Sequence, residues 1–176
     1  TVTFPAIQEM AQVWIPIATT DAFQQVKVLS MDVPGTYQLL KDRDYNNTIL
    51  YFKAGKEHSG KVIEIKYQVT RVEKTALEEK GKVDPRYLQA NLLMPVGGRF
   101  EEIAQEAIEG SDQTDLMKAR ALYDYIIDNM RYMKYGTFGT GDANYACDAR
   151  TGNCTEFHSF FISLARSIGI PARFAV

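Results

Sequence analysis

The first half of the chain alternates apolar and polar residues in short runs. Alternation is strict over residues 63–70, and a period of two is typical of a strand with one buried face. Four earlier runs are rich in Val, Ile, Tyr and Thr and are separated by turn-forming residues: 13–17, 25–33, 36–40 and 48–52. Strands at this spacing favour a small antiparallel β-sandwich.

Helical spacing replaces this alternation in the second half. A short amphipathic segment over residues 100–108 ends at Gly110. Asp112 is then predicted to be the N-cap of a longer helix that runs to about Met130. The side of this helix predicted to be buried carries Leu116, Ala119, Tyr123, Ile126, Ile127 and Met130. Residues 136–152 are polar and rich in glycine, so they are predicted to form a connector.

A further helical pattern begins at Cys154. The apolar residues that follow it recur at helical spacing and define the predicted buried side: Phe157, Phe160, Phe161, Leu164, Ala165 and Ile168. The predicted solvent side carries Thr155, Glu156, Ser159, Ser163, Arg166 and Ser167. Because Cys154 falls on the apolar side, its thiol is predicted to point inward, into a cleft or a core. Gly169 and Pro171 end the helix, and Phe174 is expected to begin a strand.

Between the two halves the composition shifts towards charged residues, proline and glycine. Residues 79–98 are therefore predicted to be a linker, with a possible helical turn inside it. The chain then divides into a β-domain over residues 1–78 and a helical domain over residues 99–176. The predicted fold class is α+β.

Composition excludes several classes of protein. Lys and Arg total 20 against 22 Asp and Glu, which gives a net charge of -2 and no basic surplus for a phosphate backbone. Nucleic acid is therefore not an expected partner. No apolar run approaches the roughly 20 residues needed to span a bilayer. No loop carries the dense carboxylates that calcium needs, and no cofactor or metal is expected.

Cys154 is the strongest candidate for chemistry. The thiolate is the reactive form of cysteine, and the free N–H groups at a helix N-terminus favour negative charge. The alternatives are a buried structural cysteine and a disulfide with Cys147. Zinc binding by Cys147, Cys154 and His158 would lack a fourth ligand. His158, one turn after Cys154, is either a local catalytic partner or a packed histidine.

Two segments around this helix resemble a known family. Residues 152–161 read Gly-Asn-Cys-Thr-Glu-Phe-His-Ser-Phe-Phe, and residues 164–174 read Leu-Ala-Arg-Ser-Ile-Gly-Ile-Pro-Ala-Arg-Phe. Together they resemble the nucleophile helix of the transglutaminase-like superfamily, including the spacing from Cys154 to the Gly-Ile-Pro-Ala-Arg run. Residues 138–143 also fit the bacterial members, and the first half resembles the N-terminal β-domain of such proteins.

The resemblance implies a papain-like core in which a Cys, a His and an Asp act together in that chain order. Cys154 would attack an amide carbonyl of a protein or peptide and form a thioester, which water or an amine then resolves. The enzyme would be a cysteine peptidase or a protein-glutamine acyltransferase. The family's His and Asp follow the Gly-Ile-Pro-Ala-Arg run, so His158 is not the implied base. Because this chain stops at Val176, we expect it to be the front part of a longer enzyme and inactive alone.

Strands missing after Val176 would leave the apolar side of the last helix uncovered. We therefore expect this side to associate with a second copy or to pack on the chain's own β-domain. The alternative function is a non-catalytic transglutaminase-like module for protein binding or assembly. By resemblance to exported bacterial members, the protein is expected in the periplasm or secreted.

Overall fold

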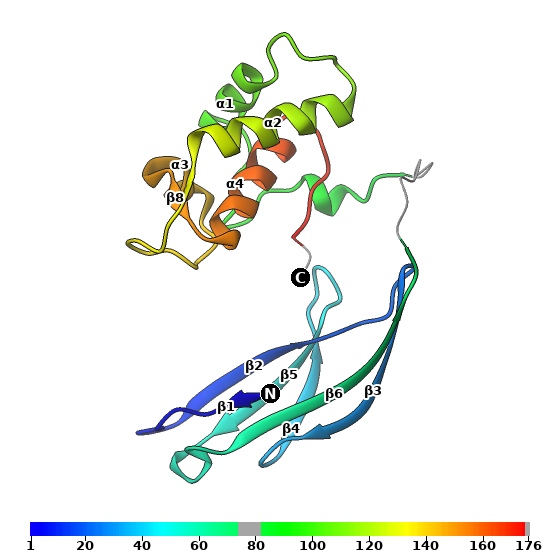
Figure 1. The fold of residues 1–176 in the computed structure, drawn as a ribbon, viewed down its shortest axis with the longest axis vertical. Coiled ribbons are helices and arrows are strands. Elements are labelled where there is room, and N and C mark those ends of the chain that lie inside the picture. Colours follow the sequence, from blue (N-terminus) through cyan, green and yellow to red (C-terminus); the bar gives the residue numbers. More distant parts are fainter. Residues whose placement is uncertain (74–81, 175–176) are drawn as a thin grey trace. The chain divides into compact units, whose positions relative to one another are not determined.

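The computed structural model describes residues 1–73 and 82–174, which fall into two compact units. The first, Thr1–Glu79, contains two antiparallel sheets, and the second, Lys80–Val176, contains four α-helices among its described residues (Figure 1). Each unit has an apolar core of its own. This combination of elements confirms the predicted α+β fold class.

The first unit consists of two three-stranded antiparallel sheets. One has the order β1-β6-β3, formed by Val2–Thr3, Val62–Arg71 and Gln24–Asp32. The other has the order β2-β5-β4, formed by Ala11–Ile17, Thr48–Ala54 and Tyr37–Lys41. A short 3₁₀ helix, η1 (Lys56–His58), precedes β6. The five strands predicted from the alternating pattern are therefore confirmed.

Alternating burial along β5 builds the core of this unit. Leu50, Phe52 and Ala54 are buried, whereas the residues between them lie on the opposite face of the sheet. Ile63 of β6 is also buried, but Val69 near the end of that strand is 48% exposed. The alternation in β6 therefore buries only the first part of the strand.

α4 (Cys154–Ser167) is the central helix of the second unit. It contacts α1 (Arg99–Ala107), α2 (Asp115–Asn129) and α3 (Ala143–Ala149) (Figure 1). A short parallel pair, β7 (Arg131–Tyr132) and β8 (Thr151–Gly152), joins the end of α2 to the start of α4. None of the helices in the described part of the chain is long and apolar enough to cross a membrane.

The predicted cap of α2 is wrong, and its predicted buried side is confirmed only in part, at Ile126 and Met130. Thr114, not Asp112, is the N-cap, because its hydroxyl accepts a backbone N–H from the first turn of the helix. Leu122 and Ile126 are buried, whereas Leu116 is 78% exposed. Apolar residues lie on several sides of this helix, so spacing alone allows more than one buried stripe. Packing against α4 selects the stripe that contains Leu122.

The predicted connector over residues 136–152 contains a helix, α3, that the sequence pattern missed. Asp142 caps it by accepting a backbone N–H at 2.8 Å, and Arg150 ends it in the left-handed conformation with φ of 53°. Its buried residues are Ala143, Ala146 and Cys147. Seven residues make too few turns for a helical period to stand out from the polar residues around them.

The described part of the predicted linker, residues 82–98, takes part in the hydrogen bonding of the second unit. It contains a 3₁₀ helix, η2 (Pro85–Leu88), and the Gly97 N–H donates to the Ser167 hydroxyl at 2.9 Å. The preceding residues, 74–81, lie outside the described residues. The segment from residue 82 onward is thus fixed to the end of α4.

Candidate active site

Cys154 is the first residue of α4, as predicted. Asn153 is the N-cap, and its side-chain oxygen accepts the Thr155 N–H at 2.8 Å and the Thr155 hydroxyl at 2.7 Å. The helix starts at this point because Asn is among the best N-cap residues. Cys154 therefore lies at a helix N-terminus, where negative charge is favoured.

Cys154 is exposed, so its thiol does not lie in a core, which was one of the two predicted positions. The predicted solvent side of α4 is buried instead, at Glu156, Ser159, Ser163 and Arg166. Three other helices contact α4, so the helix has no single buried stripe. Spacing from the apolar residues could not fix the direction of the thiol for that reason.

Much of the apolar side of α4 lies in the core of its own unit. Phe160, Leu164 and Ala165 are fully buried, and Phe157 and Phe161 are partly buried. The expectation of an uncovered apolar side is therefore wrong for these three core residues. Self-association through this helix stays a prediction, but fewer apolar residues of α4 are left for such an interface than the sequence predicted.

The backbone N–H of Cys154 has no partner among the hydrogen bonds of the described residues. The neighbouring groups are engaged: the Asn153 N–H donates to Glu156, the Thr155 N–H to the cap, and the Phe157 N–H to the Asn153 carbonyl at 3.2 Å. A free donor next to an exposed thiol can bind the oxygen anion that forms when a thiolate attacks a carbonyl.

A buried carboxylate lies two residues after this cysteine. Glu156 is 0% exposed. Its Oε1 accepts the N–H groups of Gly139 and Gly141 at 2.8 and 2.9 Å, and its Oε2 accepts the Asn153 N–H at 3.0 Å. The Thr155 hydroxyl also lies within hydrogen-bonding distance of Oε1, at 3.2 Å. The carboxylate thus joins the loop before α3 to the start of α4.

These donors set the charge state of Glu156. Burial alone would raise the pKa of its carboxyl, because a low-dielectric environment disfavours the charged form. The N–H groups of Gly139, Gly141 and Asn153 bind the charged form and outweigh burial, so the pKa lies below its ordinary value. At neutral pH Glu156 is therefore an ionised carboxylate held by backbone dipoles.

Sequence reasoning missed Glu156 by assigning it to the solvent side. The signal that could have found it is its position three residues after Asn153, because a Glu there reaches back to the N–H of the N-cap residue. That reciprocal capping box is present. The donors Gly139 and Gly141 lie 17 and 15 residues before Glu156, and no local pattern connects them to it.

Gly152 is required because the Glu156 side chain lies against its Cα. A Cβ at this position would lie 2.3 Å from the Glu156 Cβ and 2.6 Å from its Cγ, closer than real Cβ atoms approach. In the Gly-Asn-Cys run, Gly152 therefore leaves space for Glu156, Asn153 caps α4, and Cys154 is the first helical residue.

His158 packs against an aromatic ring. It is exposed, and its ring meets the Phe174 ring edge-on with centroids 4.7 Å apart. Phe174 lies in no strand, contrary to expectation, and residues 175–176 lie outside the described residues. The other histidine, His58, belongs to the first unit, where its Nδ1 accepts the Gly55 N–H at 2.9 Å.

The two cysteines differ in access to solvent. Both are free thiols, so the disulfide considered as an alternative is absent. Cys147 is only 8% exposed, whereas Cys154 is exposed. No group of three His, Cys, Asp or Glu residues in the described ranges could hold a metal ion. A reagent in solution therefore meets Cys154 far more readily than Cys147.

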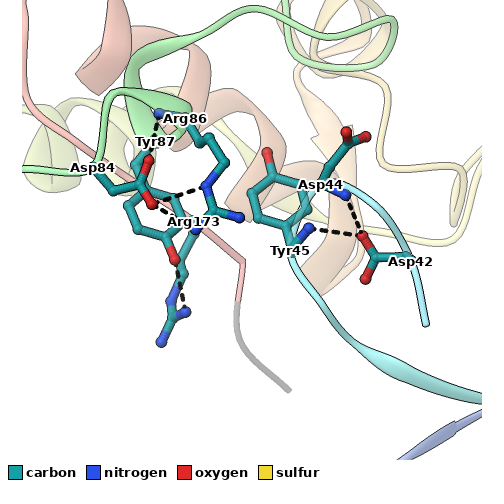
Figure 2. Close-up of polar contacts among 7 residues, drawn as sticks. All are labelled: Asp42, Asp44, Tyr45, Asp84, Arg86, Tyr87 and Arg173. Carbon is teal, nitrogen blue, oxygen red and sulfur yellow. Dashed lines mark hydrogen bonds and ion pairs between the residues drawn. The ribbon is translucent and has the colours of Figure 1, made fainter.

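The C-terminal end of α4 is held by a buried arginine. Arg166 donates to the Ala172 carbonyl at 2.9 Å through Nε and 2.6 Å through Nη2, and to the Gln89 carbonyl at 2.7 Å through Nη1. Just beyond, Arg173 donates to the Tyr87 hydroxyl at 3.1 Å (Figure 2). These bonds fix the residues after α4 to the segment around η2.

The second unit is similar to a known protein family. Residues 101–176 match the family model of the transglutaminase-like superfamily core. The chain is 28% identical over 187 residues to an uncharacterized protein of Haemophilus influenzae, and the match covers 94% of this chain and 49% of that relative. It is also similar to the crystal structure of a candidate cysteine protease from Cytophaga hutchinsonii, with a TM-score of 0.70 and 16% identity over 94% of this chain and 61% of that one.

The chain thus spans about half the length of the Haemophilus relative. The similarity to the Cytophaga protein shows a shared fold that extends over both units, since it covers 94% of this chain. The matched residues 101–176 include Cys154, Glu156 and nearly all of the four α-helices. The helical unit of this chain is therefore similar to the core of the transglutaminase-like superfamily.

Proposed function

We propose that this chain carries the nucleophile of a thiol-dependent enzyme that acts on protein or peptide amides, with Cys154 as the attacking residue. The observation that carries the proposal is the exposed thiol at the first residue of α4, next to its own unpaired backbone N–H. A nucleophile and an oxyanion donor on one residue are the minimum that acyl transfer to sulfur needs. The family match of residues 101–176 supports the same reaction class.

In the proposed reaction the Cys154 sulfur forms a bond to the amide carbon, and the carbonyl oxygen takes up the electron pair as an oxyanion. The Cys154 N–H would hold that oxyanion. Collapse of the intermediate breaks the C–N bond, the amine leaves with a proton from a general acid, and a thioester remains. Water would resolve the thioester in a peptidase, and an amine would resolve it in a transglutaminase.

We place the general base outside this chain. Two histidines are present: His58 lies in the first unit, and the His158 ring is packed against Phe174. Support for an external base comes from relatives that are longer than this chain, which covers 49% of one and 61% of another. On this proposal the chain by itself has a reactive thiol and turns over slowly.

The test uses the full-length gene product and a glutamine-containing peptide, with and without a primary amine. Hydrolysis of the peptide chain indicates a peptidase, and ammonia release coupled to amine incorporation indicates a transglutaminase. Cys154→Ser should abolish either reaction, whereas Cys147→Ser should leave it in place. Activity that survives in Cys154→Ser would overturn the proposal, and inactivity of the wild type would favour the binding-module alternative.

We also propose that the protein acts outside the cytoplasm, as a periplasmic or secreted protein. The support is the resemblance of the β-rich first half to the N-terminal domain of exported bacterial members. Fractionation of the native host and immunodetection of the protein in each fraction test this. Recovery with cytoplasmic markers alone would contradict it.

A further inference from the structure

One side chain, Glu156, connects two segments that flank Cys154. Its Oε2 accepts the N–H of Asn153, the residue immediately before the cysteine, at 3.0 Å. Its Oε1 accepts two N–H groups from the loop before α3, those of Gly139 and Gly141. Glu156 is thus the link between this loop and the residues that carry the thiol.

Glu156 accepts more hydrogen bonds than a helix cap requires. Asn153 already caps α4, so the helix start doesn't depend on Glu156 alone. No ion pair among the described residues includes Glu156, so its buried charge is balanced by backbone donors. Burying a charge is costly unless every lone pair is satisfied. Glu156 fits here only because Gly152 has no side chain. A buried carboxylate at this position indicates that it fixes the backbone around Cys154.

The position of the Cys154 N–H depends on this link. That N–H belongs to the peptide group that joins Asn153 to Cys154. The Glu156 carboxylate fixes the N–H of Asn153, and the side-chain oxygen of Asn153 is fixed in turn by Thr155. The chain is therefore held on both sides of the donor, so the donor keeps one direction relative to the thiol.

We propose that Glu156 is a positioning residue for the reaction of Cys154. By binding the N–H groups of Asn153, Gly139 and Gly141, it keeps the Cys154 N–H and the loop before α3 in the arrangement that acyl transfer needs. This inference rests on the proposed function. It assigns Glu156 no contact with the substrate and no transfer of protons.

The test compares two reactions of Cys154 in the chain described here. Acetylation by p-nitrophenyl acetate forms a thioester, releases nitrophenolate and passes through an oxyanion. Alkylation by iodoacetamide forms a thioether, releases iodide and passes through no oxyanion. The ratio of the two rate constants, measured at Cys154 by mass spectrometry, reports the oxyanion donor and cancels changes in simple access to the thiol.

We expect Glu156→Gln to lower the acetylation-to-alkylation ratio at Cys154 by about tenfold or more, because the donor loses its fixed direction. The amides of Gly139 and Gly141 should also exchange with deuterium faster. Gly141→Ala provides a second route, because it keeps Glu156 but places a side chain at φ of 69°. Gly110→Ala is its matched control, with φ of 76° and open space around the added Cβ.

The possible results separate the two proposals. A lowered ratio in Glu156→Gln and Gly141→Ala, with Gly110→Ala at the wild-type ratio, supports the positioning role. An unchanged ratio in Glu156→Gln or in Gly141→Ala, with the helical circular dichroism of that variant retained, overturns that role and leaves Cys154 as nucleophile. A wild-type ratio no higher than that of a short unfolded peptide around Cys154 overturns the proposed function, and the positioning role with it.

Discussion

The two ends of α4 are fixed by opposite charges and differ in what they leave exposed. Near the N-terminus, the Glu156 carboxylate binds backbone N–H groups, and near the C-terminus the Arg166 guanidinium binds backbone carbonyls. Each charge has the sign that its end of the helix dipole favours. The N-terminal end leaves Cys154 exposed with a free N–H, whereas Arg166 is buried with its donors engaged. The C-terminal end of α4 is therefore the anchored end, and the N-terminal end is where we propose that the chemistry takes place.

The largest expected effect on stability is at the anchored end. Arg166→Leu removes three charge-assisted hydrogen bonds to the carbonyls of Ala172 and Gln89, and should lower the free energy of unfolding by about 3 kcal/mol. Urea denaturation followed by helical circular dichroism measures this loss. The fluorescence of Trp14, which is the chain's single tryptophan and lies in β2 of the first unit, should change little.

Arg120→Leu is the matched control for this variant. Arg120 is exposed and pairs with Asp124 one turn further along α2. Such pairs contribute about 0.3–0.5 kcal/mol, so the loss should be small. Equal losses in Arg166→Leu and Arg120→Leu would contradict the anchoring role of Arg166.

The next largest effect is expected at the start of α4. Gly152→Ala places a Cβ against Glu156 and should cost about 2–3 kcal/mol through overpacking. Gly110→Ala places a side chain at φ of 76° with open space around its Cβ, so only a backbone cost of about 1 kcal/mol is expected. Thermal unfolding of the two variants compares them directly. A Gly152→Ala variant as stable as Gly110→Ala would show that Glu156 doesn't occupy this space in solution.

Glu156→Gln should cost about 2 kcal/mol at pH 7, because hydrogen bonds to a charged acceptor become bonds to a neutral one. The pKa of Glu156 is lowered in the folded state, so its contribution is fully present above the unfolded value of about 4.3 and is lost as pH falls through the folded pKa. The stability difference between wild type and variant should therefore shrink in acid. Urea titrations at neutral and acidic pH measure it, and a constant difference would contradict the assignment.

Among the residues that fix α4, the smallest loss of stability is expected at Ser167, next to Arg166. Ser167 accepts the Gly97 N–H and donates to the Ser163 carbonyl, and both bonds are between neutral groups. Ser167→Ala should therefore cost about 1 kcal/mol. Urea denaturation of Ser167→Ala and Arg166→Leu compares the stability contributed by neutral and by charged hydrogen bonds at this end of α4. A larger loss for Ser167→Ala would reverse the proposed order.

The fold was predictable where the pattern was local. Strand alternation identified β2 to β6, and the polar cap with the apolar run behind it identified the start of α4. Burial around α4 was not predictable in the same way. Ser163 and Arg166 are buried because segments distant in sequence cover them, and the hydrogen bond from Arg166 to Gln89 spans 77 residues.

The candidate site was predictable only in part. Cys154 at the start of α4 follows from the sequence, but the exposure of its thiol does not, because α4 is packed on several sides. Its role as nucleophile stays a prediction. Glu156 could be suspected from capping-box spacing, whereas its bonds to Gly139 and Gly141 depend on how the preceding loop folds back.

The central claim is that Cys154 reacts with carbonyl groups with the help of its own N–H. The most direct measurement is the ratio of acetylation to alkylation rate constants at Cys154 in the folded chain, compared with a synthetic peptide of residues 150–158. The peptide has the same thiol without a fixed donor. We predict a ratio at least about tenfold higher in the folded chain. Equal ratios would contradict the claim.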